Sequence, residues 1–237
     1  MSKLIVISYN INGKSKYIQD TGIKLNKYKA VINNLRENNT EWDILCLQET
    51  KSQYVGDIRS EISHLAPDGY EFLVYECINH IKPRSNGVAI IVRNKIADPT
   101  IVNSYMLDHT YQWMTDEMRN TQQDTEIGRW MSCNVTKNNA PYNIVNIYAP
   151  STSESDRQLF YDAMVDDGRW DLLENLIVTG RVTGDFNCIL NERDTNKTNP
   201  SLSESLLDMI DHYDLIDIND WGDFDTKKHS SFKQRGT

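Results

Sequence analysis

The chain has 237 residues, of which 39% are hydrophobic and 25% charged, and its formal net charge is −9 with a pI near 5.0. This length suits one two-sheet domain, and the composition suits a globule with an apolar core. The acidic balance argues against a protein that binds nucleic acid through its overall charge. No run of eighteen apolar residues and no signal-peptide pattern occurs, so we expect neither a membrane span nor secretion.

Strands and helices are predicted along the whole chain. In chain order we expect a strand at 4–9, a helix at 25–36, a strand at 44–47, a short helix at 58–65, strands at 70–75, 87–92, 130–135 and 142–148, a helix at 154–164, a strand at 177–182 and a helix at 202–213. The strands are short apolar or alternating runs, and the helix at 25–36 has apolar residues at helical spacing. We expect 70–75 to pair with 87–92, and 130–135 with 142–148.

The segment 105–126 lies between these strands and carries methionines close to Trp113. Apolar residues at helical spacing predict a helical insertion that covers a sheet edge, since exposed edges need covering. The alternative is a lobe that binds substrate or a partner. The four cysteines form no Cys-x-x-Cys motif, and we expect them to be free, buried thiols in a reducing compartment.

Polar side chains follow four of the predicted strands. Asn10 ends the first strand, Glu49 follows 44–47, Tyr148 ends 142–148, and Asp185 and Asn187 follow 177–182. A carboxylate at the end of a buried strand is costly unless a partner compensates for its charge. Carboxylate and amide groups on one rim suggest a site for a hard divalent cation and a phosphate ester. Because Asp185 and Asn187 are two residues apart, strand geometry would point them the same way.

Five ordered motifs carry a resemblance to a known family. They are Ser-Tyr-Asn-Ile-Asn-Gly (8–13), Leu-Gln-Glu-Thr-Lys (47–51), Asn-Gly-Val-Ala-Ile-Ile-Val (86–92), Asn-Ile-Tyr-Ala-Pro (146–150) and Gly-Asp-Phe-Asn (184–187). Together they resemble the endonuclease/exonuclease/phosphatase superfamily, whose fold is that of DNase I. The motif at 146–150, the extended run 184–194 and Tyr-Asp-Leu-Ile-Asp-Ile (213–218) further resemble the endonuclease domain of non-LTR (LINE-type) retrotransposons.

The resemblance implies a DNase I-like α/β sandwich, with two packed β-sheets flanked by helices, in a single domain over 1–237. In relatives, a Ser-Asp-His motif near the C-terminus completes the catalytic site, and this sequence contains none. The resemblance therefore implies that the chain lacks its C-terminal strands and is inactive as this fragment.

Each motif also implies a role for a residue of this chain. Glu49 would hold Mg²⁺ or Mn²⁺, and Asn10 would support that cation through its amide oxygen. Asp185 would orient or deprotonate the attacking water. Asn187 and Tyr148 would donate hydrogen bonds to phosphate oxygens.

Contacts to a DNA backbone are expected from two further groups of residues. The resemblance implies that Ser231 contacts a DNA phosphate. Six basic residues fall near the motifs and are candidates for a locally basic binding face: Lys14, Lys16, Lys51, Arg93, Lys95 and Arg193. The alternative for each is an ordinary solvated surface charge.

The function that the resemblance implies is metal-dependent nicking of DNA, so that the exposed 3′-hydroxyl primes reverse transcription at the target. The implied partners are DNA and a following reverse transcriptase domain, and the implied location is intracellular, in the nucleus when acting on DNA. An apurinic/apyrimidinic repair endonuclease of the same fold and a catalytically dead binding module remain alternatives. A lipid phosphatase is disfavoured, because no apolar membrane loop is evident.

Overall fold

The computed structural model describes residues 4–17, 24–79, 85–97, 106–107, 128–138, 140–151, 153–166, 180–188 and 203–212. The chain divides into two compact units. Unit 1 comprises Met1–Tyr148 with Thr179–Gly184, and unit 2 comprises Ala149–Val178 with Asp185–Thr237. Each unit is described by itself.

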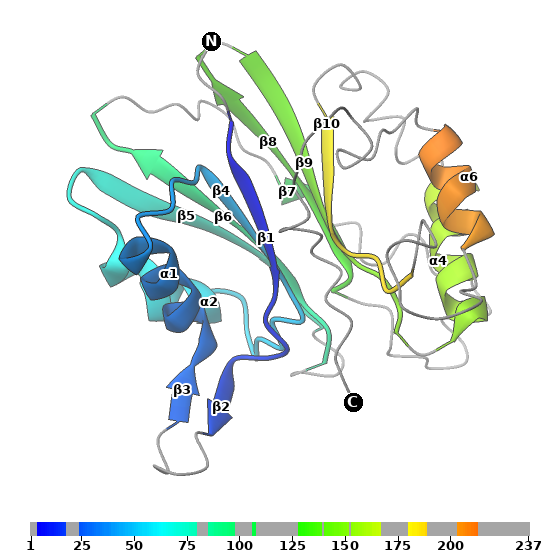
Figure 1. Cartoon of the computed structure of the whole chain (residues 1–237), viewed down its shortest axis with the longest axis horizontal. Helices are drawn as coiled ribbons and strands as arrows, with labels where there is room; N and C mark the ends of the chain where they lie inside the picture. The colour runs from blue at the N-terminus through cyan, green and yellow to red at the C-terminus, as the bar shows by residue number, and fades with distance from the viewer. Residues whose placement is uncertain are drawn as a thin grey trace. The chain divides into compact units, whose positions relative to one another are not determined.

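The first sheet of unit 1 has four strands in the order β1-β4-β6-β5. Their bounds are β1 Val6–Asn10, β4 Ile44–Gln48, β5 Tyr70–Cys77 and β6 Val88–Lys95. β1 runs parallel to β4, and the other neighbours are antiparallel. Two helices, α1 (Lys27–Glu37) and α2 (Asp57–Ile62), lie on one face of this sheet (Figure 1), and a 3₁₀ turn, η1 (Ser63–Leu65), follows α2.

The second sheet has the order β10-β9-β8-β7. Its strands are β7 Met106–Leu107, β8 Trp130–Lys137, β9 Ala140–Tyr148 and β10 Gly180–Asp185. β8 and β9 form the antiparallel pair that the sequence predicts, as do β5 and β6. Two mixed sheets with helices confirm the expected α/β class.

Alternation along β4 gives the first sheet two buried faces. Leu45 and Leu47 pack with residues of α1 and α2. Ile44 and Cys46 face the other way and pack with Met131 of β8 and other residues of the second sheet. The first sheet therefore lies between a helical layer and a second sheet, and β4 is buried along its whole length.

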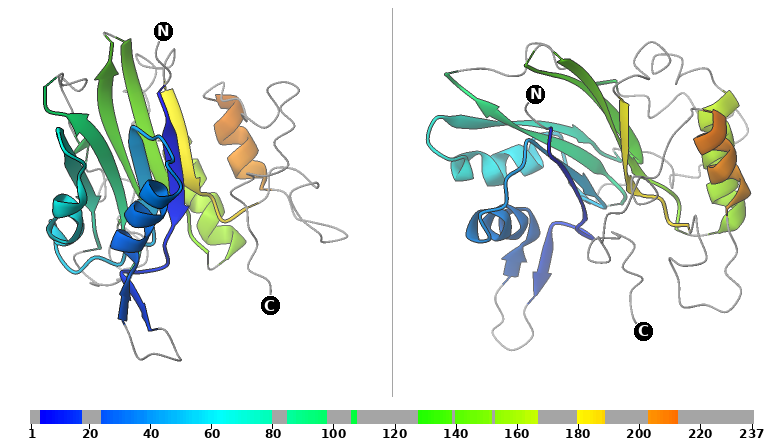
Figure 2. Two further views of the ribbon diagram at one scale, coloured as in Figure 1. Left: turned by 60° about the vertical axis from the view of Figure 1, so that its left-hand side comes forward. Right: turned by 45° about the horizontal axis from the view of Figure 1, so that its top comes forward.

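A two-stranded hairpin was not expected from the sequence. β2 (Ser15–Tyr17) pairs antiparallel with β3 (Lys24–Asn26), and Figure 2 shows the pair extending beyond α1. α1 therefore begins at Lys27 rather than at Leu25. The side chain of Asn26 caps it by accepting hydrogen bonds from the backbone N–H groups of Tyr28 and Lys29.

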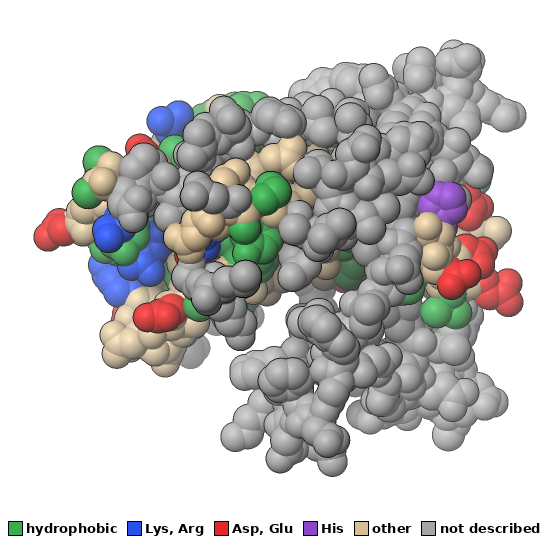
Figure 3. Space-filling view, turned by 90° about the horizontal axis from the view of Figure 1, so that it is seen from above, with side chains coloured by type: hydrophobic (Ala, Val, Ile, Leu, Met, Phe, Trp, Pro, Cys, Tyr) green, Lys and Arg blue, Asp and Glu red, His purple; other side chains and the backbone are tan. Residues whose placement is uncertain are grey.

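Unit 2 has two described helices, α4 (Glu154–Asp166) and α6 (Glu204–His212), which pack against each other (Figure 2). Both were expected from the sequence. α6 buries Leu206 and Met209, and it exposes Glu204, Asp208 and Asp211. Acidic side chains gather on this helical part of the molecule (Figure 3), so this exposed face is unsuited to a phosphate backbone.

Of the segment 105–126, the structure describes only Met106–Leu107, which form β7 beside β8. The rest lies outside the described residues, so the helical insertion stays a prediction. The cysteines are free as expected: Cys46, Cys77 and Cys133 are buried and Cys188 is partly buried. Among the described helices, none is both long enough and apolar enough to cross a membrane.

Candidate active site

Asn10 and Glu49 are brought together by the parallel pairing of β1 with β4. The register places Asn10 opposite Gln48, so both strands end at the same edge of the sheet. The Asn10 amide nitrogen donates a hydrogen bond to Glu49 Oε1 at 2.9 Å. The Asn10 amide oxygen accepts one from the backbone N–H of Asn12 at 2.9 Å. Asn10 therefore orients the carboxylate through its nitrogen, whereas the sequence predicts a role for its oxygen.

The backbone around Glu49 is held in an uncommon conformation. Glu49 and Lys51 have φ values of 51° and 52°, in the left-handed region that non-glycine residues rarely adopt. The backbone N–H groups of Thr50 and Lys51 donate to the carbonyls of Gly87 and Asn86 at 3.0 and 2.8 Å. Conformations of this cost persist where the surroundings enforce them, often at functional sites. These contacts turn the chain sharply at the end of β4 and fix Glu49 there.

Three neighbours keep the Glu49 carboxylate ionised. Partial burial raises the pKa of Glu49, but hydrogen bonds from Asn10, Lys51 and Tyr148, together with the positive charge of Lys51, outweigh burial and hold the pKa below its ordinary value. Lys51 Nζ lies 3.0 Å from Glu49 Oε2, and it also donates to Asn12 Oδ1 at 2.8 Å. The Glu49 side chain is only 14% exposed. An anionic, positioned oxygen ligand is thus available at neutral pH.

Tyr148 is held by a buried arginine that the sequence analysis missed. Arg129 is 4% exposed, its Nη1 donates to the Tyr148 carbonyl at 3.2 Å, and its guanidinium lies 5.2 Å from the centre of the Tyr148 ring. The Tyr148 N–H donates in turn to the Arg129 carbonyl at 2.6 Å. The sequence could have indicated Arg129, because it is a charged residue directly before a mostly apolar strand.

The residues around Glu49 fit a hard divalent cation of the Mg²⁺ type. Such an ion takes oxygen ligands, retains several waters and is commonly held by one or two carboxylates. Glu49 supplies one carboxylate, and the second lone pair of the Asn10 amide oxygen is a further candidate donor. Across the described part of the chain, no three His, Cys, Asp or Glu side chains cluster at one place.

The loop after Lys51 is anchored at both ends. Its far end is held by Glu76 Oε1 on β5, which accepts three backbone N–H groups at 3.1 to 3.3 Å, those of Gly56, Ile58 and Arg59. Burial raises the pKa of Glu76, and the nearby Asp57 charge adds to this, although the three hydrogen bonds act in the opposite direction. Between the anchors, Tyr54 and Val55 are 55% and 68% exposed. The loop therefore presents two apolar side chains from a fixed base.

Asp185 and Asn187 in unit 2 form a turn. Asn187 has a φ of 50°, and its backbone N–H donates to Asp185 Oδ1 at 3.1 Å. β10 ends at Asp185, so the prediction that strand alternation aligns these two side chains is wrong, because Asn187 lies beyond the strand. The Asn187 amide nitrogen donates to the Ala149 carbonyl at 2.6 Å, and the Ala149 N–H donates to the Asp185 carbonyl at 2.9 Å.

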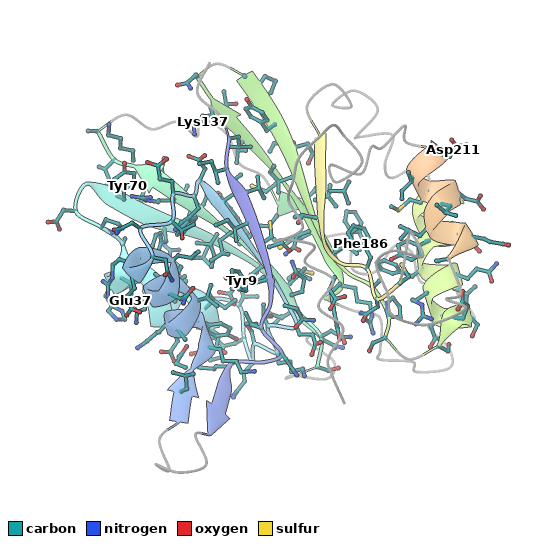
Figure 4. The ribbon with its side chains drawn as sticks, viewed as in Figure 1. Tyr9, Glu37, Tyr70, Lys137, Phe186 and Asp211 are labelled. Atoms are coloured by element: carbon teal, nitrogen blue, oxygen red, sulfur yellow. The ribbon has the colours of Figure 1, made fainter. Side chains whose placement is uncertain are left out.

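A buried tyrosine supports this turn from α4. The Tyr161 hydroxyl donates to the Phe186 carbonyl at 2.7 Å and lies 3.5 Å from Cys188 Sγ. Phe186 is labelled in Figure 4, just past the end of β10. Burial raises the pKa of Tyr161 well above its ordinary value, so the hydroxyl keeps its proton as a donor. The Asp-Phe-Asn part of the motif is thus held by hydrogen bonds within unit 2.

The expected basic face is only partly supported. Lys14 binds Asp57 and Glu61 at 2.6 and 3.0 Å, and Lys51 binds Glu49. Arg93, near the end of β6, stacks on Tyr70 with its guanidinium 4.3 Å from the ring centre. The β4–β6 register puts Arg93 and Lys95 at the opposite end of the sheet from Glu49, so their inclusion in one face is wrong. Arg193 and Ser231 lie outside the described residues.

Comparison with solved structures shows the fold. An AP endonuclease from Leishmania major matches with a TM-score of 0.58 and 17% identity, over 91% of this chain and 67% of that one. A β-hairpin deletion mutant of beta toxin from Staphylococcus aureus matches at 0.52 and 12%, over 91% and 74%. A mannosyl-6-phosphatase from Bacteroides thetaiotaomicron matches at 0.51 and 17%, over 78% and 66%. These names span different substrates, so the shared fold does not select one.

Sequence comparison identifies the family. A search of curated protein sequences finds no match. The model of the endonuclease/exonuclease/phosphatase family matches residues 7–233, which is nearly the whole chain and includes all five motifs. The chain belongs to the endonuclease/exonuclease/phosphatase family.

Proposed function

We propose that this protein is a divalent-metal-dependent phosphodiesterase that nicks DNA, and that it serves as the endonuclease of a non-LTR retrotransposon. The observation that carries the proposal is the ionised Glu49 carboxylate, fixed at the end of β4 by Asn10, Lys51 and Tyr148. The retrotransposon assignment rests on the sequence runs at 146–150, 184–194 and 213–218, and DNA and a reverse transcriptase domain are its proposed partners.

Glu49 would hold Mg²⁺ or Mn²⁺, with Asn10 beside it, and the ion would supply charge neutralisation to the phosphoryl group. Asn10 and Lys51 keep the carboxylate anionic and oriented before the ion arrives. The Tyr148 hydroxyl is the proposed donor to a phosphate oxygen. Its single hydrogen would turn from Glu49 to the phosphate when substrate binds, and a hydrogen bond there counts most as charge develops.

Asp185 is the proposed base that orients or deprotonates the attacking water. The turn hydrogen bond from the Asn187 N–H occupies one lone pair of Asp185 Oδ1, and a carboxylate offers about four acceptor sites, so others stay available. Asn187 donates one amide hydrogen to the Ala149 carbonyl, and its second amide hydrogen is the proposed donor to phosphate.

The test is metal binding by two matched variants, expressed from the natural reading frame. Glu49→Gln removes the proposed ligand charge. Glu61→Gln removes a carboxylate that also pairs with lysines, Lys14 and Lys29, but takes no part in the proposed site. In a Mn²⁺ titration followed by electron paramagnetic resonance, Glu49→Gln should lose the bound ion and Glu61→Gln should keep it. Equal binding by both variants would show that the metal assignment is wrong.

Hydrolysis then separates the alternatives. Supercoiled plasmid and an oligonucleotide duplex with one abasic site are incubated with Mg²⁺ and the wild-type protein expressed from its full natural reading frame. Nicking of intact plasmid supports the proposed endonuclease. Cleavage confined to the abasic duplex indicates a repair enzyme, and DNA binding without cleavage indicates a binding module.

A further inference from the structure

Two buried amide side chains join the two sheets of unit 1 close to Glu49. Gln48 is 1% exposed and Asn146 is fully buried. Gln48 Nε2 donates to Asn146 Oδ1 at 2.6 Å and to Ser8 Oγ at 3.0 Å. Asn146 Nδ2 donates to the carbonyls of Leu47 and Ala89 at 3.0 and 2.9 Å. These four hydrogen bonds connect β1, β4 and β6 of the first sheet with β9 of the second.

The network uses every hydrogen that the two amide groups can donate. A buried donor without a partner carries the full cost of its lost hydration, so each bond restricts where the strands can lie. The surrounding contact between the sheets is made by apolar residues such as Ile44, Val88 and Ile144. Apolar contact is not directional and tolerates small shifts of one sheet over the other. The amides therefore supply the directional constraint at this end of the sheets.

Both amides continue rows of apolar side chains that face the opposite sheet. On β4 the row is Ile44, Cys46 and then Gln48, and on β9 it is Ile144, Asn146 and then Tyr148. Glu49 directly follows Gln48, and Tyr148 is the next residue on the same face after Asn146. Tyr148 is one of the neighbours that lower the pKa of Glu49 by hydrogen bonding, so its hydroxyl lies next to this carboxylate. The amide pair thus lies next to Glu49 and Tyr148, just before each of them along the chain.

A second polar tie lies at the other end of the same sheets. Lys137 Nζ contacts Asp43 Oδ1 and Oδ2 at 2.8 and 2.7 Å. Lys137 ends β8, as Figure 4 shows, and Asp43 directly precedes β4. This ion pair fixes the two sheets relative to each other at the end far from Glu49. At the end that carries Tyr148, the amide pair has this role.

We infer that Asn146 and Gln48 are positioning residues: they hold the Tyr148 hydroxyl against the Glu49 carboxylate and so determine how well the site holds a cation. The consequence for metal binding rests on the proposed function, whereas the Tyr148–Glu49 contact does not. Neither amide touches the reacting atoms in this assignment. This positioning role also explains two motif positions, the first residue of Asn-Ile-Tyr-Ala-Pro and the Gln of Gln-Glu-Thr-Lys.

A double-mutant cycle tests the coupling without metal or substrate. Tyr148→Phe removes only the hydroxyl that reaches Glu49, and in the wild-type background it should raise the unfolding equilibrium constant by about tenfold or more. In the Asn146→Ala background the same change should have little effect. The control background is Asn143→Ala, a buried asparagine on the same strand that faces away from the first sheet. There the effect of Tyr148→Phe should match that in the wild type.

A milder variant covers the case in which Asn146→Ala does not fold. Gln48→Met has a side chain of similar length and leaves both Asn146 donor bonds intact, but it removes the link between the two amides. Urea unfolding followed by far-ultraviolet circular dichroism provides the equilibrium constants. Equal effects of Tyr148→Phe in the Asn146→Ala or Gln48→Met background and in the Asn143→Ala background would overturn the inference.

A Mn²⁺ titration tests whether the positioning role also affects metal binding. Asn146→Ala should weaken Mn²⁺ binding by about 10–100-fold, the range seen for residues that support metal ligands, and Asn143→Ala should not weaken it. If the wild-type protein binds no Mn²⁺, the proposed function fails while the cycle still decides the positioning role. If Mn²⁺ binds equally to both variants, the positioning role does not extend to the metal.

Discussion

Gly184→Ala should destabilise unit 1 strongly, because the residue before Asp185 admits no side chain. Gly184 has a φ of 147°, and an added Cβ would overlap the Ile147 carbonyl oxygen and lie 2.8 Å from its carbonyl carbon. A backbone conformation reserved for glycine costs about 1–3 kcal/mol, and overpacking against a neighbouring strand costs about 1–3 kcal/mol more. We therefore expect a loss of about 2–6 kcal/mol in the free energy of unfolding, measured by urea unfolding with circular dichroism.

Gly69→Ala is the matched control, because it isolates the conformational part of that loss. Gly69 also has a positive φ, 78°, but no atom lies within 4 Å of an added Cβ. Its substitution should cost about 1–2 kcal/mol, the penalty for a left-handed residue alone. If both variants lose the same free energy, the close approach of β10 to β9 does not explain why glycine is required at position 184.

Three further outcomes follow from contacts of individual side chains. Asp185→Asn should slow DNA cleavage about 10²–10⁴-fold with unchanged DNA affinity, and an equal loss of affinity would point to misfolding instead. Asn26→Ala should lower the free energy of unfolding by about 1 kcal/mol through loss of the α1 cap, and a change below about 0.3 kcal/mol would contradict the cap. The folded pKa of Glu49 lies below its ordinary 4.5, so its stabilisation is complete above that pH and is lost as pH falls through the folded value. Glu49→Gln should therefore destabilise the protein at pH 7, and this difference should shrink as the pH falls below 4.5; a pH-independent difference would contradict the lowered pKa.

Strand and helix positions were predictable where apolar spacing was regular. β4, β6 and β9 have long buried runs, and the sequence predicts a strand at each of them. It also pairs β6 with β5 and β9 with β8, as the structure does. The β2–β3 hairpin was not predictable from that signal, because its three-residue strands are largely polar and pair only with each other. Regular apolar spacing indicates burial, and Ser-Lys-Tyr and Lys-Leu-Asn are too short and too polar to show such spacing.

The candidate site was predictable as residue types at strand ends, but its contacts were not. Parallel pairing of β1 with β4 makes the meeting of Asn10 with Glu49 a natural expectation. The Glu49–Lys51 ion pair depends on two left-handed residues, and the Arg129–Tyr148 contact joins residues 19 positions apart. Asn187 shows the converse, because a turn hydrogen bond overrides the alternation that its spacing suggests.

The anchored loop between Lys51 and Gly56 lets the exposed residues at its tip vary in sequence independently of Glu49. Its ends are tied to the Gly87–Asn86 turn and to Glu76, so changes at its tip do not reach the Glu49 carboxylate through the backbone. Tyr54 and Val55 can therefore diverge, or be replaced by a grafted sequence, while the position of the Glu49 side chain is kept. A loop built this way can change its exposed surface without rebuilding the contacts that hold Glu49.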